Sequence, residues 1–445
     1  MKADGPLKNT EKSLSSGLLD ITGLAVDDRV RDRAVLHLID WMGCAIAGRK
    51  TEIGRIFRDG DGLPQVTSDP MSEALAYGAL GSILEMDDVH RTALLHPGPV
   101  VIPAALALSG HDEPGDFLDA IVQGYEAMIR VGRSVGAAHY ASFHNTATCG
   151  GAGSAVASAR MLKLDAERSV WALGNAMTLA SGLWECRNEP VFTKPLHVAE
   201  ACRRGVQAAF YAARGLSGPS RIFEGSQGFF AGLARDGRPD FMLVDPDGPW
   251  LIEETSFKPW PACRHAHATI DATLEARSQI GSRAIRAIRI FTYADAVRFC
   301  DKPAPQTVGE AKFSLQHAAA VVLTKGIPML EDFEPDAIAR PEFAQLRRLA
   351  EVHADSGLTA DYPAHFGSRV DIDLADGTTV SATVADALGD SENPMAESAI
   401  IDKFHTLCTW AGVSDREQAP LIALAKDLRS GAPVASLKAA LSTHL

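Results

Sequence analysis

The sequence predicts a mainly α-helical protein with a smaller α+β second domain. Before about residue 235, long stretches place apolar residues at helical spacing. Strand and hairpin patterns appear only after a turn-rich segment at 239–249, and helical spacing returns near the end of the chain. The chain has 445 residues, more than one hydrophobic core usually supports, so we expect two domains.

The N-terminal half contains five stretches with helical character: 30–47, 99–108, 117–135, 150–164 and 200–213. The first stops at a glycine, and the second opens with a proline, which suits a first helical turn. The fourth stretch, GGAGSAVASARMLKL, is rich in small residues that let helices approach closely. We therefore expect a bundle of long helices with a tightly packed centre.

The second half begins with a candidate strand at 284–292 and later shows a hairpin pattern. The hairpin joins 368–375 to 378–384 through Asp376-Gly377, a dipeptide that suits a type I′ turn. Helical spacing lies between these strands and returns in the last part of the chain; these stretches are 310–323, 343–352, 395–410 and 419–428. We expect the last helices to pack back on the first domain.

The composition limits the classes of partner. The formal charge of −13 argues against a nucleic-acid or anionic-membrane surface, but it leaves a small anionic substrate open, because such a ligand responds to the local field of its pocket. No apolar run of about 18 residues predicts a spanning helix. Residues 1–16 are polar and lack the apolar stretch of a secretory signal, so we expect a cytoplasmic protein.

The seven cysteines are scattered and form no CxxC pair. This pattern is not that of a disulfide framework, an iron–sulfur site or a structural zinc site. We therefore expect free thiols and no metal.

The first cluster of reactive side chains lies within 85–96 and consists of Glu85, Asp87, Asp88, His90 and His96. His96 immediately precedes a predicted helix start, where backbone N–H groups favour an anion. The cluster is also compatible with a solvated loop, or with an acid that caps the following helix.

Two further clusters each pair a histidine with hydroxyl or cationic groups. His144 and Thr148 precede the glycine-rich helix, which fits an acid/base group beside a carboxylate-binding helix start, although Thr148 could also simply cap that helix. Lys194 and His197 flank Pro195; a lysine held there is suited to a carboxylate, although surface lysines are common.

A fourth cluster lies in a loop stiffened by two prolines and contains Lys258, Cys263, Arg264, His265 and His267. Arg264 could grip a carboxylate through two N–H groups. No triad order supports Cys263 as a nucleophile. His265 and His267 would face apart on a helix and make a poor metal pair. In a fifth cluster, His317 opens an apolar helix as either a ligand or a core histidine.

The order of these clusters resembles the MmgE/PrpD family from about residue 20 to 430. The similarity lies in Asp-Asp followed by His-Pro, then Phe-His-x-Thr, Thr-Lys-Pro-x-His, Lys-Pro-Trp-Pro-x-Cys-Arg-x-x-His and Phe-Ser-Leu. Further landmarks are Gly-Tyr-Glu at 124–126 and Glu-Asn-Pro-Met at 392–395. The family includes 2-methylcitrate dehydratases, cis-aconitate decarboxylases and iminodisuccinate epimerase-like members.

The resemblance implies an all-helical domain made of residues 17–245 and 394–445, with an α+β lid domain at 246–393 inserted between them. It also implies a homodimer and a metal-free pocket between the domains. The family's catalytic positions fall on His96, His144, Lys194 and Lys258. The substrate-binding candidates are Glu85, Asp88, His90, Thr148, His197, Cys263, Arg264 and His317.

The resemblance favours a metal-free lyase that removes a proton α to a carboxylate of a small di- or tricarboxylic acid. Cys263-Arg264 is typical of the dehydratase-like members, whereas the decarboxylase branch has histidine at 263 and tyrosine at 317. We therefore rank a 2-methylcitrate dehydratase-like reaction first, and decarboxylation or epimerisation second. In this mechanism His144 is the base and His96 the acid or a carboxylate ligand, and the two roles can be exchanged.

Two other classes of function remain open from the sequence. One is a metal hydrolase that uses Asp88, His90 and His96, although their spacing does not match a helical metal motif. The other is a non-catalytic protein that binds carboxylates.

Overall fold

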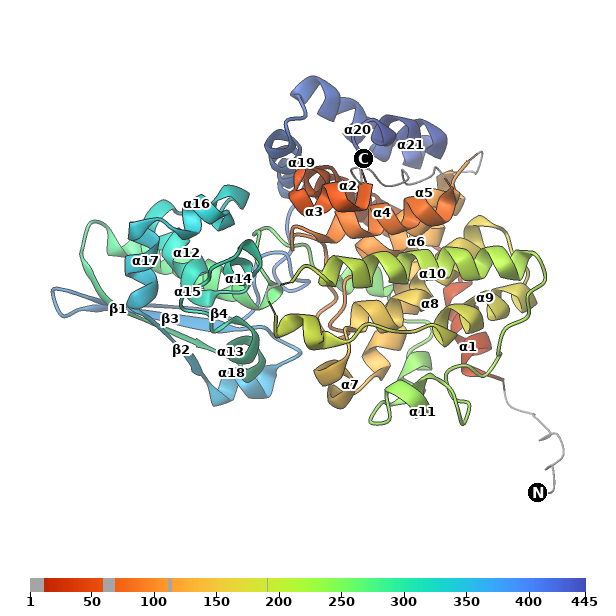
Figure 1. Cartoon of the computed structure of the whole chain (residues 1–445), viewed down its shortest axis with the longest axis horizontal. Helices are drawn as coiled ribbons and strands as arrows, with labels where there is room; N and C mark the ends of the chain where they lie inside the picture. Colours follow the sequence, from red (N-terminus) through yellow and green to blue (C-terminus); the bar gives the residue numbers. More distant parts are fainter. Residues whose placement is uncertain (1–11, 59–68, 111–113, 190) are drawn as a thin grey trace.

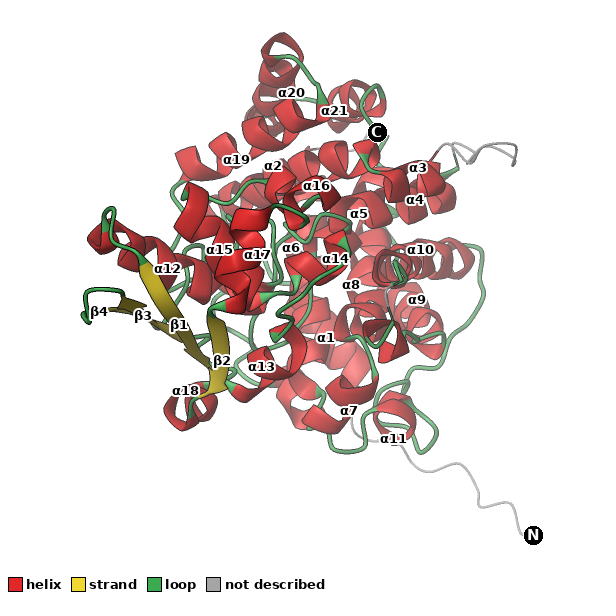
Figure 2. Ribbon diagram, turned by 60° about the vertical axis from the view of Figure 1, so that its left-hand side comes forward, coloured by secondary structure: helices red, strands yellow, loops and turns green. Residues whose placement is uncertain are grey.

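The computed structural model describes residues 12–58, 69–110, 114–189 and 191–445. It is mainly helical, with one four-stranded sheet (Figures 1 and 2). We call the larger part the helical body. Its helices are α1 (Leu14–Thr22), α2 (Asp28–Lys50), α3 (Glu52–Arg58), α4 (Pro70–Ser82), α5 (Gly98–Leu108), α6 (Pro114–Ser134), α7 (Ala137–Ser142), α8 (Asn145–Met161), α9 (Ala166–Thr178), α10 (Lys194–Ala213), α11 (Phe229–Leu233), α19 (Glu397–Ala411), α20 (Asp415–Asp427) and α21 (Val434–Ser442).

The smaller part, here called the α/β unit, lies between α11 and α19 in the sequence. Its strands are β1 (Ile285–Thr292), β2 (Ala350–Ala354), β3 (Ser368–Leu374) and β4 (Thr379–Val384). Its helices are α12 (His267–Ile280), α13 (Ala294–Cys300), α14 (Val308–Lys312), α15 (Leu315–Lys325), α16 (Pro335–Ile338), α17 (Pro341–Arg348) and α18 (Ser356–Asp361). Within the described residues, no helix combines the length and apolar character that crossing a membrane requires.

The strand order in the sheet is β2-β1-β3-β4, with β1 parallel to β2 and antiparallel to β3. Along β1, Ile288 and Ile290 are buried while their neighbours are partly exposed, and helix α12 contacts β3 and β4. The sheet therefore buries one face under helices and forms a core separate from that of the body (Figure 2).

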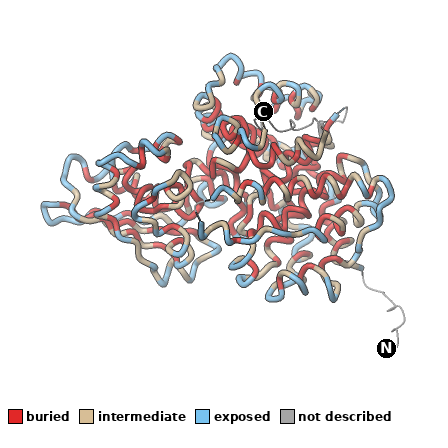
Figure 3. Tube along the Cα trace, viewed as in Figure 1, coloured by how far each residue is buried: buried red, intermediate tan, exposed pale blue. Residues whose placement is uncertain are grey.

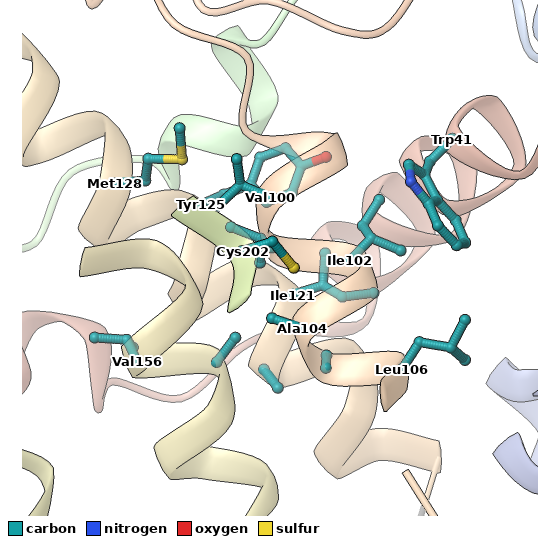
Figure 4. Packing of buried hydrophobic residues seen from close by; sticks show 14 of the residues in the cluster. Trp41, Val100, Ile102, Ala104, Leu106, Ile121, Tyr125, Met128, Val156 and Cys202 are labelled. Carbon is teal, nitrogen blue, oxygen red and sulfur yellow. The ribbon is translucent and has the colours of Figure 1, made fainter. Parts of the chain in front are cut away.

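The body is built around α8, which packs against α6 and α10 and is buried over nearly all of its length. The interior of the body is accordingly mostly buried (Figure 3). The small residues of α8 make this packing possible: a Cβ on Gly153 would lie 2.7 Å from the carbonyl oxygen of Gly124 on α6. Larger side chains such as Tyr125, Ile102 and Val156 fill the surrounding space (Figure 4). The predicted tight centre is therefore present, and the last helices return to the body, where α19 packs along α2.

Several local predictions need correction. The hairpin turn is not type I′, because only Gly377 has positive φ (87°); its N–H donates to Leu374 O, which makes a type I turn followed by a left-handed glycine. The helix expected at 310–323 breaks where Ser314 caps α15. Residues 350–352, expected to be helical, belong to the short strand β2. Thr148 is not a helix cap, because α8 begins after His144.

Candidate active site

The loop between α4 and α5 supplies the acidic side chains of the site. Glu85 lies in the left-handed region with φ of 58°, an uncommon conformation for a residue other than glycine and one that recurs at functional sites. After this residue the side chains alternate in direction. Glu85 and Asp87 face lysines and His96, whereas Met86 packs in a small apolar cluster and Asp88 faces the body.

Two lysines from different parts of the chain meet at Glu85. Lys194, the first residue of α10, donates to both carboxylate oxygens of Glu85 at 2.6 and 2.7 Å. Lys258, from the segment before α12, donates to Glu85 O at 3.0 Å and lies 3.8 Å from its carboxylate. Burial alone would raise the pKa of Glu85, but the two ammonium groups outweigh it and hold that pKa below its ordinary value.

Asp87 connects Lys258 to His96. Its Oδ1 lies 3.6 Å from Lys258 Nζ, and its Oδ2 lies 3.0 Å from His96 Nδ1. His96 Nδ1 also lies 2.9 Å from the carbonyl oxygen of Asp88, which can only accept a hydrogen bond, so Nδ1 carries the proton. In the neutral ring this leaves Nε2 as the proton acceptor. Although burial opposes it, the charges of His96 and Lys258 lower the pKa of Asp87.

Asp88 is committed to the interior of the body instead. Its Oδ2 accepts hydrogen bonds from His37 and Tyr125, both at 2.6 Å, and its Oδ1 accepts from the N–H of Gly98 at 2.8 Å. Neighbouring acids in the same loop thus serve different purposes: Asp87 faces the cluster of lysines, and Asp88 fixes the start of α5.

His144 is the residue that precedes α8, and its ring stacks on Trp184 with the centroids 4.4 Å apart. The side chain is buried, and its Nδ1 has no hydrogen-bond partner in the described structure. Burial, together with Lys194, His197 and His96, lowers the pKa of His144 well below its ordinary value. His144 is therefore neutral near pH 7 and can accept a proton through a ring nitrogen.

His197 and Thr148 flank His144. The His197 ring lies 5.5 Å from that of His144, one helical turn after Lys194 on α10. Thr148 is buried in the first turn of α8, with its hydroxyl 2.9 Å from His139 Nε2. The structure thus groups His197 with the predicted catalytic residues, while Thr148 is engaged with a neighbouring histidine.

Cys263 and Arg264 have different surroundings. The Cys263 thiol faces the thiol of Cys300 and lies near Glu85 and Lys194. Arg264 donates to Asp390, an acid that Arg91 of the body also contacts at 3.4 Å. The Nε and Nη1 atoms of Arg264 have no hydrogen-bond partner among the described residues. Arg264 is therefore part of a buried ion-pair group where the α/β unit meets the body.

The two remaining candidates have partners outside this cluster. His90 Nε2 lies 3.5 Å from Glu254, and its Nδ1 accepts from the N–H of Ala93. His317 Nε2 donates to Asp332 O at 2.8 Å, and its Nδ1 lies 3.0 Å from Arg347 Nη1. Both ring nitrogens of His317 are thus occupied within the α/β unit, which fits the core role left open by the sequence.

Two family models match this chain. The MmgE/PrpD N-terminal domain matches residues 19–242, and the MmgE/PrpD C-terminal domain matches residues 260–428. The chain belongs to the MmgE/PrpD family. The matched regions cover most of the helical body and most of the α/β unit, and Lys258 lies in the short segment between them.

Similar proteins include several that are named cis-aconitate decarboxylase or cis-aconitate decarboxylase-like. The human protein is 25% identical over 431 residues, which cover 89% of this chain and 87% of that protein. The cis-aconitate decarboxylase-like protein oryM of Aspergillus oryzae is 26% identical over 380 residues, 78% of each chain. The Aspergillus terreus cis-aconitate decarboxylase is 24% identical over 430 residues, 87% of each. The family is thus of lyase type, and this chain is a distant member.

The sequence analysis missed residues that border the cluster. Trp184 stacks on His144, and the Arg187 guanidinium lies 4.6 Å from the Trp184 ring and 4.5 Å from that of Phe299 in the α/β unit. Lys312 is buried, and its Nζ donates to Leu84 O at 2.9 Å. The charged stretch around Arg187 stands out in the sequence. Nothing in the sequence, however, shows that Arg187 of the helical body contacts Phe299 of the α/β unit.

The donor set favours anion chemistry over metal binding. Glu85 and Asp87 already face ammonium groups, which compete with a cation for their oxygens. Elsewhere among the described residues, His365, Asp386 and Glu392 lie close enough to share an ion, but Arg91 donates to both of these acids. The central cluster instead places two imidazoles beside fixed cations, an arrangement that suits proton transfer next to a carboxylate.

Proposed function

We propose that the protein is a metal-free lyase that forms a carbanion-like state α to a carboxylate of a small di- or tricarboxylic acid. The observation that carries this proposal is the chain of contacts from Lys194 through Glu85, Lys258 and Asp87 to His96. An enediolate needs fixed positive charge where its negative charge develops. Lys194 and Lys258 supply that charge, and the histidines supply proton transfer.

His144 is the proposed base and His96 the proposed acid. The lowered pKa of His144 keeps its ring neutral, which a base requires. The opposite assignment has support of its own, because Asp87 orients His96 and leaves Nε2 as an acceptor. In either case each histidine contributes on the order of 10²–10⁴ in rate.

Dehydration is the first candidate reaction. The base removes the α proton, the C–O bond to the β-hydroxyl breaks, and the acid protonates the leaving group as water. Cys263 supports this choice over decarboxylation. By the family resemblance, decarboxylases have an imidazole at this position, whereas this chain has a free thiol close to the thiol of Cys300.

Decarboxylation is the second candidate, favoured by the names of the relatives. In that reaction the C–C bond to one carboxylate breaks and carbon dioxide leaves. The electron pair stays on the substrate carbon that carried the carboxylate, and a histidine protonates that carbon. Epimerisation, with the proton returned to the opposite face, uses the same groups.

We also propose a cytoplasmic homodimer. Several large apolar side chains are exposed close to the start of α10, which supports a protein surface there: Leu183 (62%), Val191 (47%), Phe192 (51%) and Leu196 (43%).

Proton NMR in deuterated water tests the proposed function. Purified protein is incubated with 2-methylcitrate, citrate, cis-aconitate and related acids. We expect deuterium at the α carbon or net turnover with at least one of them, and loss of both in His96→Ala and His144→Ala. Thermal protection by these acids without exchange or turnover would instead identify a carboxylate-binding protein.

A further inference from the structure

Three buried lysines donate to three consecutive carbonyl oxygens around the left-handed residue Glu85. Lys312 Nζ lies 2.9 Å from Leu84 O, Lys258 Nζ lies 3.0 Å from Glu85 O, and Lys403 Nζ lies 2.6 Å from Met86 O. The lysines come from α14, from the segment before α12 and from α19. The conformation of the acidic loop therefore depends on groups from both the body and the α/β unit.

The three ammonium groups differ in how their charge is balanced. Lys403 pairs with Asp40 at 2.6 Å, and Lys258 lies 3.6 Å from Asp87. For Lys312, by contrast, no carboxylate of the described residues lies within 4.0 Å of Nζ, although the side chain is buried. A buried ion without a partner is costly and persists where it serves the function of a site.

We propose that Lys312 is a positioning residue of the active site, which holds the turn at Glu85 through Leu84 O and supplies a positive charge that becomes balanced only when an anionic substrate binds. This inference rests on the proposed function for its ligand, a polycarboxylate. The inference adds to that function a coupling between substrate binding and the protonation of Lys312. Lys312 itself does not contact the reacting atoms.

The surroundings of Lys312 make the coupling measurable. The groups that face it are Glu85 of the loop, Glu334 before α16, Lys258, and the thiol of Cys44 on α2. Burial dominates among these influences and lowers the pKa of Lys312 to about 8. An arriving carboxylate raises that pKa, so the protein takes up a proton, about half a proton per ligand near pH 8 and almost none at pH 6.

Calorimetry with tricarballylate tests this coupling. Tricarballylate has three carboxylates but neither a hydroxyl nor a double bond, so it binds without reacting. Titrations at pH 8 in two buffers of different ionisation enthalpy give the number of protons taken up. We expect uptake in the wild type and in the control Lys325→Met, whose lysine is the last residue of α15 and pairs with Asp332.

Two variants at position 312 distinguish the effect of a positive charge on affinity from the effect of its protonation on proton uptake. Lys312→Arg keeps a permanent charge, so it should bind within about threefold of wild-type affinity without proton uptake. Lys312→Met should bind about tenfold or more weakly, again without uptake. Wild-type uptake in Lys312→Arg, or wild-type affinity in Lys312→Met, would overturn the proposal.

A measurement without ligand tests the positioning role separately. Amide hydrogen exchange of the peptide that covers residues 84–88 should be faster in Lys312→Met than in Lys325→Met, and Lys312→Arg should restore part of the protection. Equal exchange in all variants would refute the positioning role. Failure of the wild type to bind any polycarboxylate, with exchange altered as expected, would count against the proposed function instead.

Discussion

Asp87 Oδ2 lies 3.0 Å from His96 Nδ1, and the same nitrogen lies 2.9 Å from the backbone carbonyl of Asp88. The imidazole is therefore held by two oxygens, one charged and one neutral, on a single side of the ring. Such a pair fixes both the orientation of a histidine and the nitrogen that carries its proton. The opposite nitrogen, Nε2, takes no part in either contact, so it is free to serve the proposed proton transfer.

The first prediction concerns this pair. Asp87→Asn should lower kcat on the substrate found by the NMR screen by about 10²-fold or more, because a neutral amide no longer orients His96 as a charged acceptor and no longer stabilises its protonated form during proton transfer. KM should change much less. Asp88→Asn is the matched comparison: it removes the acceptor of His37 and Tyr125, so it should lower the melting temperature more than it lowers kcat. Equal kcat in Asp87→Asn and wild type would exclude an orienting role.

The second prediction concerns His144. Burial and neighbouring cations lower its pKa well below 6.5, so the ring stays neutral as the pH falls through 6.5. If His144 is the base, the acid limb of the kcat profile should lie well below pH 6.5. His144→Ala should lower kcat by about 10²–10⁴ with a small change in KM.

The control for this variant is His353→Ala, which removes a partly exposed histidine of β2 and should leave kcat unchanged. An acid limb at or above pH 6.5 would assign the base to another group.

The third prediction separates the two roles of Arg264. In the structure Arg264 donates to Asp390, and Arg91 of the helical body donates to the same carboxylate. Removing one member of a buried charged group costs about 3–5 kcal/mol, so Arg264→Met should lower the free energy of unfolding by an amount of that order. KM measured below the melting temperature should change little. A large rise in KM with unchanged stability would show instead that Arg264 grips a substrate carboxylate.

The fourth prediction is loss of stability in acid. Burial is the main cause that lowers the pKa of His37 to about 4, of His265 to about 3 and of His317 to about 4. Between about pH 4 and 6.5 the unfolded chain therefore binds more protons at these histidines, and the free energy of unfolding falls as the pH is lowered. The slope is at most about 1.4 kcal/mol per pH unit for each histidine.

Asp40, whose pKa burial raises to about 6, opposes this trend, as do Glu126 and Asp271, whose pKa values burial also raises. The histidines outnumber them, because burial also lowers the pKa of five further histidines: His90, His139, His144, His197 and His267. Melting temperatures measured from pH 7 to 5 should therefore decrease, and His317→Gln should decrease less steeply. An identical slope in both proteins would mean that His317 is not buried as a neutral ring.

The fifth prediction concerns metal dependence. Because Glu85 and Asp87 face lysines, we expect dialysis against a chelator to leave turnover unchanged. Activity that disappears on dialysis and returns with a divalent cation would contradict the metal-free mechanism. His365→Ala, which disrupts the trio of His365, Asp386 and Glu392 found among the described residues, would then show whether that trio is responsible.

The sequence predicted the main architecture because periodicity records burial. The stretch at 30–47 became α2, and the strand at 284–292 became β1. Strand β2 was missed because its five residues, AEVHA, lie at the sheet edge and are specified by pairing with β1, not by local propensity. The break at Ser314 depends on a cap whose bond to the N–H of His317 competes with a continuous helix.

Site residues were predictable as far as their chemistry stands out in a motif. His96, His144, Lys194 and Lys258 were proposed in this way, and the structure brings them into one neighbourhood, while their catalytic roles stay predictions. Lys312 was passed over because a lysine next to an apolar helix is ordinarily exposed, and its burial against Leu84 O is a tertiary contact. Asp88 has the same chemistry as Asp87, so only the direction of its side chain separates them.

The alternation of side chains along the loop has a consequence for its length. Deleting or inserting one residue between Glu85 and Asp88 would reverse the direction of the side chains that follow. Asp87, which contacts His96, would then point toward His37, and Asp88 would point toward His96. Point changes at one position affect one contact, whereas such a shift would disrupt all of them together. Redesign of this segment should therefore keep its residue count and vary only the side chains.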